Sequence, residues 1–171
     1  MEVYEALKAR RTVRKFKPEP VSDESLGRIL EAARWAPSSR NQQPWHLVVV
    51  KERERLKTIG EIARTGGFIA FAPLAIAIVM SDADQPGMDA GRALQQMEVM
   101  AWSEGMGTCF VTLPDDENRR VKEVLDIPAE MDLITVLPFG YRIDDLKSRG
   151  NPRKPMAEIV HLERFGRHPD A

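Results

Sequence analysis

The sequence predicts an α+β domain in three layers, and three observations support this fold class. Amphipathic stretches and short runs rich in valine and isoleucine are mixed along the chain, without the strict alternation of a doubly wound sheet. The run LAIAIVM, at residues 74–80, is apolar throughout and indicates a buried strand. The length of 171 residues suits one domain with a real core. We therefore expect residues 1–171 to form a single domain.

The N-terminal half is expected to mix helices and strands. Apolar residues near the start predict a short first helix that ends close to the arginine pair at 10–11. The stretch 22–36 predicts a helix with Ser22 as its N-cap and with Leu26, Ile29 and Trp35 among its apolar face, which Pro37 ends. The remaining elements follow from period and composition: a strand at 45–51, a helix at 52–64 that stops at a glycine pair, and the strand at 74–80.

The C-terminal half centres on a long helix, from Asp89 to Gly105, that is apolar around most of its girth. Such a helix must be buried on more than one face, and we expect a single chain to leave Met97, Met100 and Trp102 partly in water. Patterns beyond it predict a strand at 108–112, a helix at 115–126 and a strand at 133–141. The tail at 154–165 has strand-like residues without an obvious partner in the chain.

Composition narrows the function classes. The net charge of -1 gives no reason to expect nucleic acid or an anionic membrane as a partner. The longest apolar run, residues 68–80, is too short to span a bilayer, and the start of the chain does not resemble a signal peptide, so we expect a cytoplasmic protein. Cys109 is the only cysteine, which excludes an intrachain disulfide, and its apolar setting favours a buried structural thiol. The three histidines have no metal-ligand spacing.

A basic cluster lies near the N-terminus, in the stretch ARRTVRKF. Arg10, Arg11, Thr12 and Arg14 combine guanidinium groups with a hydroxyl, which suits the bidentate hydrogen bonding of a phosphate. A solvated basic helix end that complements the helix dipole is the alternative. A second basic stretch, RGNPRKP, contains Arg149, Arg153 and Lys154 and could hold an anion or simply connect two elements.

The loop APSSRNQQPW, residues 36–45, is unusually rich in amides and hydroxyls. Ser38, Ser39, Asn41 and Gln43 could form turns that satisfy their own backbone. Amide side chains also donate and accept hydrogen bonds together, which suits the edge of a heterocycle. The sequence contains no nucleophile motif, P-loop or dinucleotide glycine pattern, so an enzyme of this sequence would rely on a cofactor for its chemistry.

Taken together, four motifs resemble those of the nitroreductase family of flavin enzymes, in the same order and over nearly the whole chain. They are RRTVRKF, APSSRNQQPWHLVVV, GMGTCFVT and FGYRIDDLKSRGNPRKPMAEIV. The chain departs from the family pattern at Thr12, where serine is usual, at Phe110, where tryptophan is common, and at Arg142, where proline is common. It also has no room, between residues 112 and 133, for the extra helical segment of longer members.

The resemblance implies a mainly antiparallel sheet, bound FMN, and a homodimer in which the C-terminal strand is swapped to the partner. The residues that it assigns to the FMN phosphate and the ribityl chain are Arg10, Arg11, Thr12 and Arg153. The loop that it assigns to the contact across the dimer interface contains Pro37, Ser38, Ser39, Asn41 and Gln43. The segment that it places near flavin N5 is Val111, Thr112 and Leu113. Arg14 is assigned to the pyrimidine end of the ring, where a cation favours reduced flavin.

The resemblance therefore predicts an oxidoreductase that passes hydride from NADH or NADPH through FMN to a small electron-poor acceptor, a nitroaromatic or a quinone. Three alternatives stay open. The chain could be a specialised flavin enzyme, of the reductive dehalogenase or flavin-fragmenting type. It could be a flavin-binding protein with little turnover. A basic-arm nucleic-acid binder is the third, and it has little support beyond the N-terminal arginines.

Overall fold

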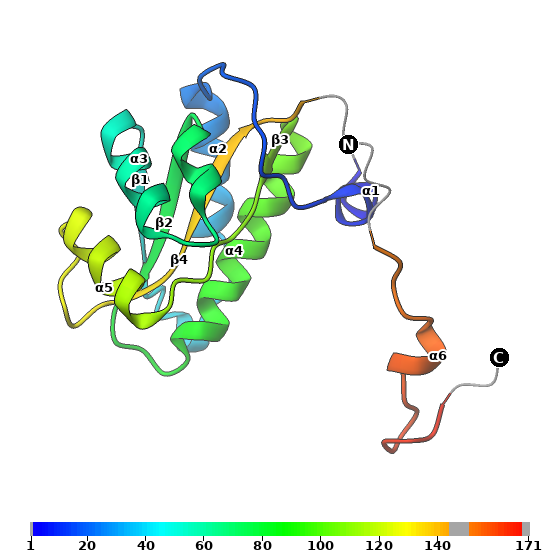
Figure 1. Cartoon of the computed structure of the whole chain (residues 1–171). Helices are drawn as coiled ribbons and strands as arrows, with labels where there is room; N and C mark the ends of the chain where they lie inside the picture. The colour runs from blue at the N-terminus through cyan, green and yellow to red at the C-terminus, as the bar shows by residue number, and fades with distance from the viewer. Residues whose placement is uncertain (1, 144–150, 169–171) are drawn as a thin grey trace.

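The structure, a computed structural model, describes residues 2–143 and 151–168 (Figure 1). Its elements are six α-helices, two 3-10 turns and four strands. The helices are α1 (Val3–Ala9), α2 (Asp23–Arg34), α3 (Arg53–Ile62), α4 (Pro86–Ser103), α5 (Asp115–Val124) and α6 (Met156–Ile159), and the turns are η1 (Ser39–Asn41) and η2 (Gly67–Phe71). The strands are β1 (Trp45–Val50), β2 (Leu74–Met80), β3 (Met106–Thr108) and β4 (Asp132–Tyr141).

The four strands form one antiparallel sheet in the order β1-β2-β4-β3. Trp45 of β1 lies opposite Met80 of β2, and the register between β2 and β4 shifts at Ile78/Val79. β1 and β3 therefore form the two opposite edges of the sheet that the described residues make. The expectation of a mainly antiparallel sheet is confirmed.

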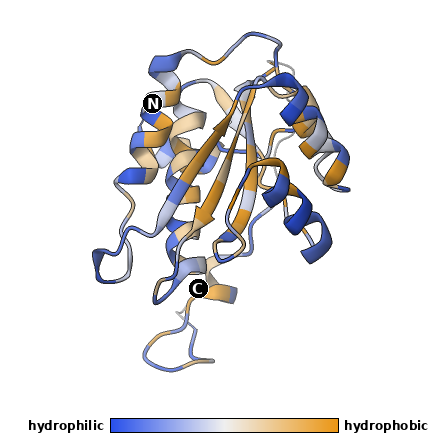
Figure 2. Ribbon diagram, turned by 90° about the vertical axis from the view of Figure 1, so that its left-hand side faces the viewer, coloured by the Kyte–Doolittle hydropathy of each residue, from blue (hydrophilic) through white to orange (hydrophobic). Residues whose placement is uncertain are grey.

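Strand β2 shows how the sequence produces three layers. All seven of its residues are buried, and they alternate between two cores. Leu74, Ile76, Ile78 and Met80 pack on the side of α2 and α4, whereas Ala75, Ala77 and Val79 pack on the side of α3 and α5. The two helical layers lie on either side of the sheet (Figure 1), and the hydrophobic residues follow the central strands (Figure 2). The three-layer α+β prediction is therefore confirmed.

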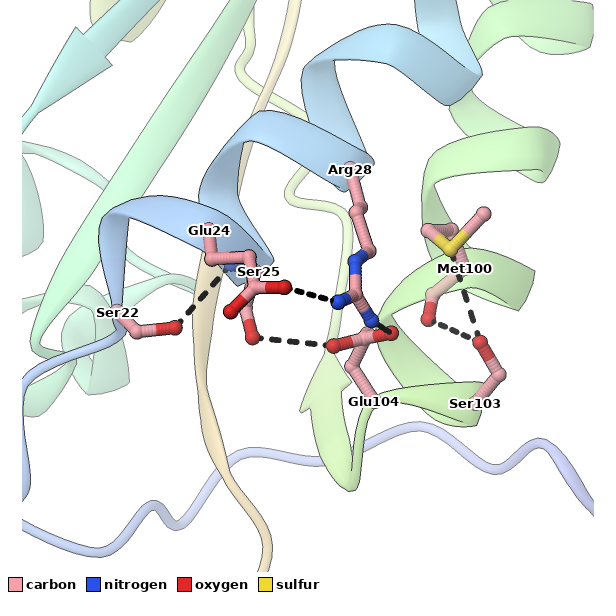
Figure 3. A network of polar contacts seen from close by, with 7 residues as sticks. All are labelled: Ser22, Glu24, Ser25, Arg28, Met100, Ser103 and Glu104. Atoms are coloured by element: carbon pink, nitrogen blue, oxygen red, sulfur yellow. Dashed lines mark hydrogen bonds and ion pairs between the residues drawn. The ribbon is translucent and has the colours of Figure 1, made fainter.

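Helix α2 begins as the sequence predicts, because Ser22 Oγ accepts a hydrogen bond of 3.1 Å from the backbone N–H of Ser25. Polar contacts then tie α2 to the end of α4 (Figure 3). Arg28 Nη1 donates to Glu104 at 2.7 Å, Ser25 Oγ donates to the same carboxylate at 3.1 Å, and Arg28 also pairs with Glu24. These contacts fix how α2 and α4 lie against each other, which matters because both helices line the groove described below.

After α4, Gly105 adopts a φ of +78°, so the chain can turn directly into β3. The N-terminal segment runs along this edge of the sheet: the N–H of Val13 donates to Thr108 O at 3.0 Å, and the N–H of Lys17 donates to Tyr141 O at 2.9 Å. Gly107 permits this approach, since a Cβ there would lie 2.3 Å from a methyl group of Val13. Thr12, one of the residues predicted to bind the phosphate, is thereby held beside β3.

Two strand predictions are wrong. Instead of a strand at 108–112, β3 ends at Thr108, and Val111 meets β4 only through an isolated bridge to Val136. The hydroxyl of Thr135 bonds both the N–H and the C=O of Val111, which replaces a strand ladder there. The tail forms the short helix α6 rather than a strand, directly after Pro155, a residue that favours the first turn of a helix.

The expected exposure of α4 is also wrong in part. Met97 is fully buried and Trp102 is 8% exposed within the single chain; only Met100 is half-buried. Trp102 is covered because the guanidinium of Arg142 lies 3.9 Å from the centre of its ring. Trp35, by contrast, was expected on the apolar face of its helix but is 70% exposed at the end of α2. Among the described residues, no helix combines the length and the hydropathy needed to cross a membrane.

Candidate functional site

The N-terminal arginines form one half of the predicted site, at the end of α1. Arg10 is the C-cap of this helix, and its Nη1 lies 3.4 Å from a carboxylate oxygen of Glu98 on α4. Arg11 Nη1 donates to the backbone oxygens of Lys8 and Arg10, at 2.6 and 2.9 Å. The structure therefore brings the two guanidinium groups to one end of α1.

Thr12 and Arg14 continue this half along the edge of the sheet. Thr12 pairs with Thr108 of β3 through an isolated parallel bridge. The guanidinium of Arg14 lies 5.7 Å from the centre of the Phe68 ring and also interacts with the thiol of Cys109. Burial raises the pKa of that thiol, and Arg14 only partly opposes the shift. Cys109 is thus a buried thiol, as the sequence predicts.

Glu98 is a charged residue that the sequence-based reasoning missed. Its side chain is only 6% exposed, and its burial raises the pKa of the carboxyl, while the charge of Arg10 lowers it. Burial of an unpaired carboxylate destabilises the folded protein, and Arg10 is the partner that the structure provides for Glu98. The Arg10–Glu98 pair ties the arginine half of the site to the middle of α4.

The amide-rich loop forms the other half, and a second buried carboxylate anchors it. The N–H of Ser39 donates to both carboxylate oxygens of Asp89, at 3.0 and 3.1 Å, and Ser39 Oγ lies 3.4 Å from one of them. Asp89 is fully buried and also accepts from Arg92 at 2.9 Å. The loop is therefore attached to the first turn of α4.

Within the loop the backbone has an unusual conformation. Arg40, Asn41 and Gln43 all have positive φ angles, at 49°, 58° and 49°. Such angles are uncommon outside glycine and persist only where surrounding contacts impose them. Here the N–H of Gln43 donates to Ser38 Oγ at 2.9 Å, and Gln43 Nε2 donates to Asn41 Oδ1 at 3.2 Å. The amides after Pro37 thus satisfy one another in part, as the self-capping alternative expects. Asn41 and Gln43 are also exposed, so their remaining hydrogen-bonding groups are accessible to a ligand.

Within one chain, the two halves lie apart. The loop leads into β1 and the arginine segment runs beside β3, and these strands are the opposite edges of the sheet. On α4, Asp89 and Glu98 are nine positions apart, which corresponds to ~13.5 Å along the axis and a rotation of ~180°. The two carboxylates therefore flank the core-facing stripe of α4 on its two sides. A single chain does not close one site from both halves.

The remaining predicted residues fall in two segments. The N–H of Val111 donates to Thr135. Of the three residues expected near flavin N5, only the exposed Thr112 and the buried Leu113 therefore retain candidate donors. Arg153 lies in the tail, exposed, with Nη1 donating to Asn151 O at 3.1 Å. Arg149 lies outside the described residues.

A large groove of ~990 Å³ opens between α1, α2 and α4. Its walls are mostly apolar, and several of the side chains that line it are largely exposed. The exposed ones include Val3, Leu7 and Trp35, and the half-buried Val99 and Met100 lie beside them. An apolar surface of this kind on a single chain is typical of a protein–protein interface.

These residues are suited to binding a ligand, and none of them is placed as a nucleophile or an acid–base catalyst. Clustered guanidinium groups bind anions, and the amide loop can match the edge of a heterocycle. Among the described residues, no group of three or more histidine, cysteine, aspartate or glutamate side chains could hold a metal ion. The fold and these residue types suit a protein that binds an organic cofactor carrying a phosphate.

Comparisons with known proteins agree with this class of protein and identify the family within it. The nitroreductase family profile matches residues 7–80 and 67–141. A provisionally named NADH dehydrogenase/NAD(P)H nitroreductase of Methanothermobacter thermautotrophicus is 31% identical over 174 residues, covering 96% of this chain and 88% of that protein. The FMN reductase [NAD(P)H] of Bacillus subtilis is 29% identical, covering 96% of this chain and 74% of that protein.

Among solved structures, an FMN-dependent nitroreductase from Clostridium difficile superimposes with a TM-score of 0.86 at 29% identity, covering 95% of this chain and 99% of that one. The chain belongs to the nitroreductase family. It is a flavin oxidoreductase of that family, whose members typically use FMN with NAD(P)H and are typically homodimeric.

The residues of this chain fit an FMN cofactor. Thr108 Oγ1 is a buried hydroxyl without a hydrogen-bond partner in the described structure, at the position that pairs with Thr12. Buried polar atoms are rarely left unsatisfied, so this one indicates a missing ligand or water beside the arginine half. The arginines nearby have the charge and the fork geometry that a phosphate needs.

Proposed function

We propose that the chain is a homodimeric, FMN-dependent NAD(P)H oxidoreductase in which each flavin site is built from both subunits. The observation that carries this proposal is the separation of the two half-sites within one chain. Asp89 and Glu98 hold the amide loop and the arginine segment on opposite sides of α4, at opposite edges of the sheet. A second copy of the chain would supply the missing half to each site.

The groove between α1, α2 and α4 supports the dimer. Val3, Leu7 and Trp35 are 69%, 52% and 70% exposed, and together with Met100 they present an apolar surface that a partner would cover. Because this groove lies on α4, which also carries both half-sites, association through it would bring the loop of one subunit towards the arginines of the other. The proposed swap of the tail onto the partner would add Arg153 to the same region.

When bound, FMN supplies the transfer of hydride and electrons, and the protein supplies binding and orientation. In this proposal Arg10, Arg11, Thr12 and Arg153 bind the phosphate and the ribityl chain. Arg14 holds a positive charge near the pyrimidine end of the ring, where it stabilises negative charge that develops on reduction. The backbone N–H of Thr112 or Leu113 would provide a hydrogen-bond donor near flavin N5.

From the partner, the remaining predicted residues would complete the site. Pro37, Ser38, Ser39, Asn41 and Gln43 form the loop whose amides and hydroxyls would contact the flavin across the interface. The positive φ angles of Asn41 and Gln43 fix the direction of these groups before the ligand arrives, which reduces the entropy lost on binding.

The substrates are proposed by class. NADH or NADPH would donate hydride, and a small electron-poor acceptor, a nitroaromatic or a quinone, would then take electrons at the same flavin. The names of the Methanothermobacter and Clostridium relatives, both nitroreductases, support this choice. Oxidation of NADH with and without menadione, a quinone, measures the activity directly.

A complementation experiment tests the shared site. Arg10→Ala and Asn41→Ala are each expected to be nearly inactive as homodimers. After both are denatured together and refolded, a heterodimer with cross-subunit sites carries both lesions in one site and neither in the other. Under random pairing, activity should return to about one quarter of the wild-type value, since half of the dimers have one intact site.

Two outcomes would contradict the proposal. Absence of any recovered activity would mean that each site is built from one chain, so that both sites of the heterodimer keep one lesion each. A monomer mass by light scattering would remove the partner altogether. The cofactor is checked independently by acid release and chromatography. FMN is expected, because the basic residues suit one phosphate and the sequence has no second glycine-rich loop for an adenosine diphosphate; FAD as the main flavin would refute it.

A further inference from the structure

Glu98 shares the guanidinium that is assigned to the cofactor phosphate. Its carboxylate lies 3.4 Å from Arg10 Nη1, inside the protein, where only 6% of the Glu98 side chain reaches solvent. Arg10 itself is more accessible, with 23% of its side chain exposed. The arginine therefore has a buried side that faces Glu98 and an open side that a ligand can approach.

One charged group pairs with Glu98 directly, and two further groups are linked to it through the thiol of Cys109. Arg10 at the end of α1 is its ion-pair partner. Cys109, after β3, lies close enough that the charge of Glu98 contributes to the raised pKa of its thiol. Arg14, in the N-terminal segment, acts on the same thiol in the opposite sense. Glu98 is thus the carboxylate among a set of groups otherwise suited to holding an anion.

We propose that Glu98 competes with the FMN phosphate for Arg10 and thereby weakens flavin binding, so that the flavin remains exchangeable. The inference rests on the proposed function, because it requires the phosphate to bind at Arg10. In the flavin-free chain, Glu98 neutralises Arg10. When the phosphate arrives, two anions share one guanidinium.

The sign of the effect follows from the burial of Glu98. A buried negative charge is poorly screened by water and salt, so its repulsion of a nearby phosphate is stronger than that of a surface carboxylate. Desolvation already disfavours the charged form of Glu98, since burial raises its pKa. A second anion adds to that cost, and the cost appears as lower affinity for FMN.

The variant Glu98→Gln isolates this charge. Glutamine keeps the shape and can still accept a hydrogen bond from Arg10, but it removes the negative charge. We expect the dissociation constant for FMN, measured by fluorescence titration of apoprotein, to fall about tenfold, and the release of FMN to slow. Riboflavin lacks the phosphate, so its affinity should stay within about twofold of the wild-type value.

Two further variants complete the design. Glu117→Gln is the matched control: Glu117 is also a buried carboxylate paired with an arginine, Arg64, but it lies on α5 in the opposite layer. Its FMN affinity should not change. Glu98→Met removes the charge with a side chain of similar size, and it provides the test if the glutamine variant does not fold.

The possible outcomes distinguish failure of the competition at Arg10 from failure of the proposed flavin-binding function. If both neutral variants of Glu98 bind FMN no more tightly than the wild type, competition is refuted. An equal gain for riboflavin would also refute it, because the effect would then not involve the phosphate. A wild-type protein that binds neither flavin would instead contradict the proposed function itself.

Discussion

The amide loop at 36–45 and the arginine segment at 10–17 are held in different ways. The loop is fixed by side chains: Asp89 accepts the N–H of Ser39, and positive φ angles at three residues give the backbone one defined shape. The arginine segment is fixed by its backbone, which pairs with β3 and β4 through Val13 and Lys17. Its guanidinium groups are held mainly by charge and by helix-end carbonyl groups.

This difference indicates two contributions to recognition. A loop of fixed shape gives selectivity for the outline of a ligand, because its hydrogen-bonding groups already point in set directions. Clustered arginines attract any suitable anion and owe their strength to charge, which salt weakens. Mutations in the two regions should therefore have different effects. Loop variants should change the shape of the loop and the stability of the protein, whereas arginine variants should change the affinity for an anion and its dependence on salt.

The largest effect is expected from the arginine that belongs to neither region within one chain. Arg153→Ala should weaken FMN binding about ten- to a hundredfold, since a charged hydrogen bond contributes ~1.5–3 kcal/mol. Lys154→Ala, one residue further on, should have a smaller effect, because Lys154 has no assigned contact with the phosphate. Flavin titration of the two variants measures this, and equal losses would mean that the tail is aligned wrongly.

The next effect concerns the anchor of the loop. Asp89→Ala removes a fully buried acceptor and leaves the N–H of Ser39 without its partner, which should lower the free energy of unfolding by about 1–3 kcal/mol. Asp84→Ala is the comparison, because its ion pair with Arg40 is exposed and such pairs contribute ~0–1 kcal/mol. Urea unfolding of both variants decides the matter. Similar losses would indicate that Asp89 does not fix the loop.

The smallest effect lies just before the loop. The pKa of Glu31 is lowered to about 2 by its hydrogen bonds with Arg34 and then with Trp35. Because the folded value lies below the usual 4.5, the stabilisation is present above pH 4.5 and is lost as the pH falls through about 2. The side chains are exposed, so salt should reduce the effect. An NMR titration of Glu31 that reached its midpoint near 4.5 would contradict this, and Arg34→Gln should raise the midpoint.

Local patterns predicted much of the fold, and the failures have physical causes. The cap at Ser22 and the apolar strand β2 depend on neighbouring residues, and both are confirmed. The strand expected at 108–112 depends on what pairs with it, and a side chain, Thr135, takes the place of a neighbouring strand. The burial of Trp102 depends on Arg142, forty residues away, which no local pattern contains.

The candidate site was predicted from motifs, but its supports were not. Asp89 and Glu98 are buried by contacts with Ser39 and Arg10, which lie 50 and 88 positions away in the sequence. A signal was present, since these are the two acidic residues of a long and largely apolar helix. Spacing of nine residues along a helix places side chains on opposite sides, and this could have indicated that the two halves face different directions.

The two edges of the sheet also differ in how they are protected, and this has a consequence for solubility. The N-terminal segment covers β3, whereas β1 has only one neighbour in the sheet of the described residues. Its sequence, WHLVVV, has high β-propensity, no charged residue and no proline, which is the signature of a segment that forms intermolecular β-structure. The loop that Asp89 anchors leads directly into this strand. Release of that anchor should therefore appear first as inclusion bodies during expression, before any loss of flavin is measurable.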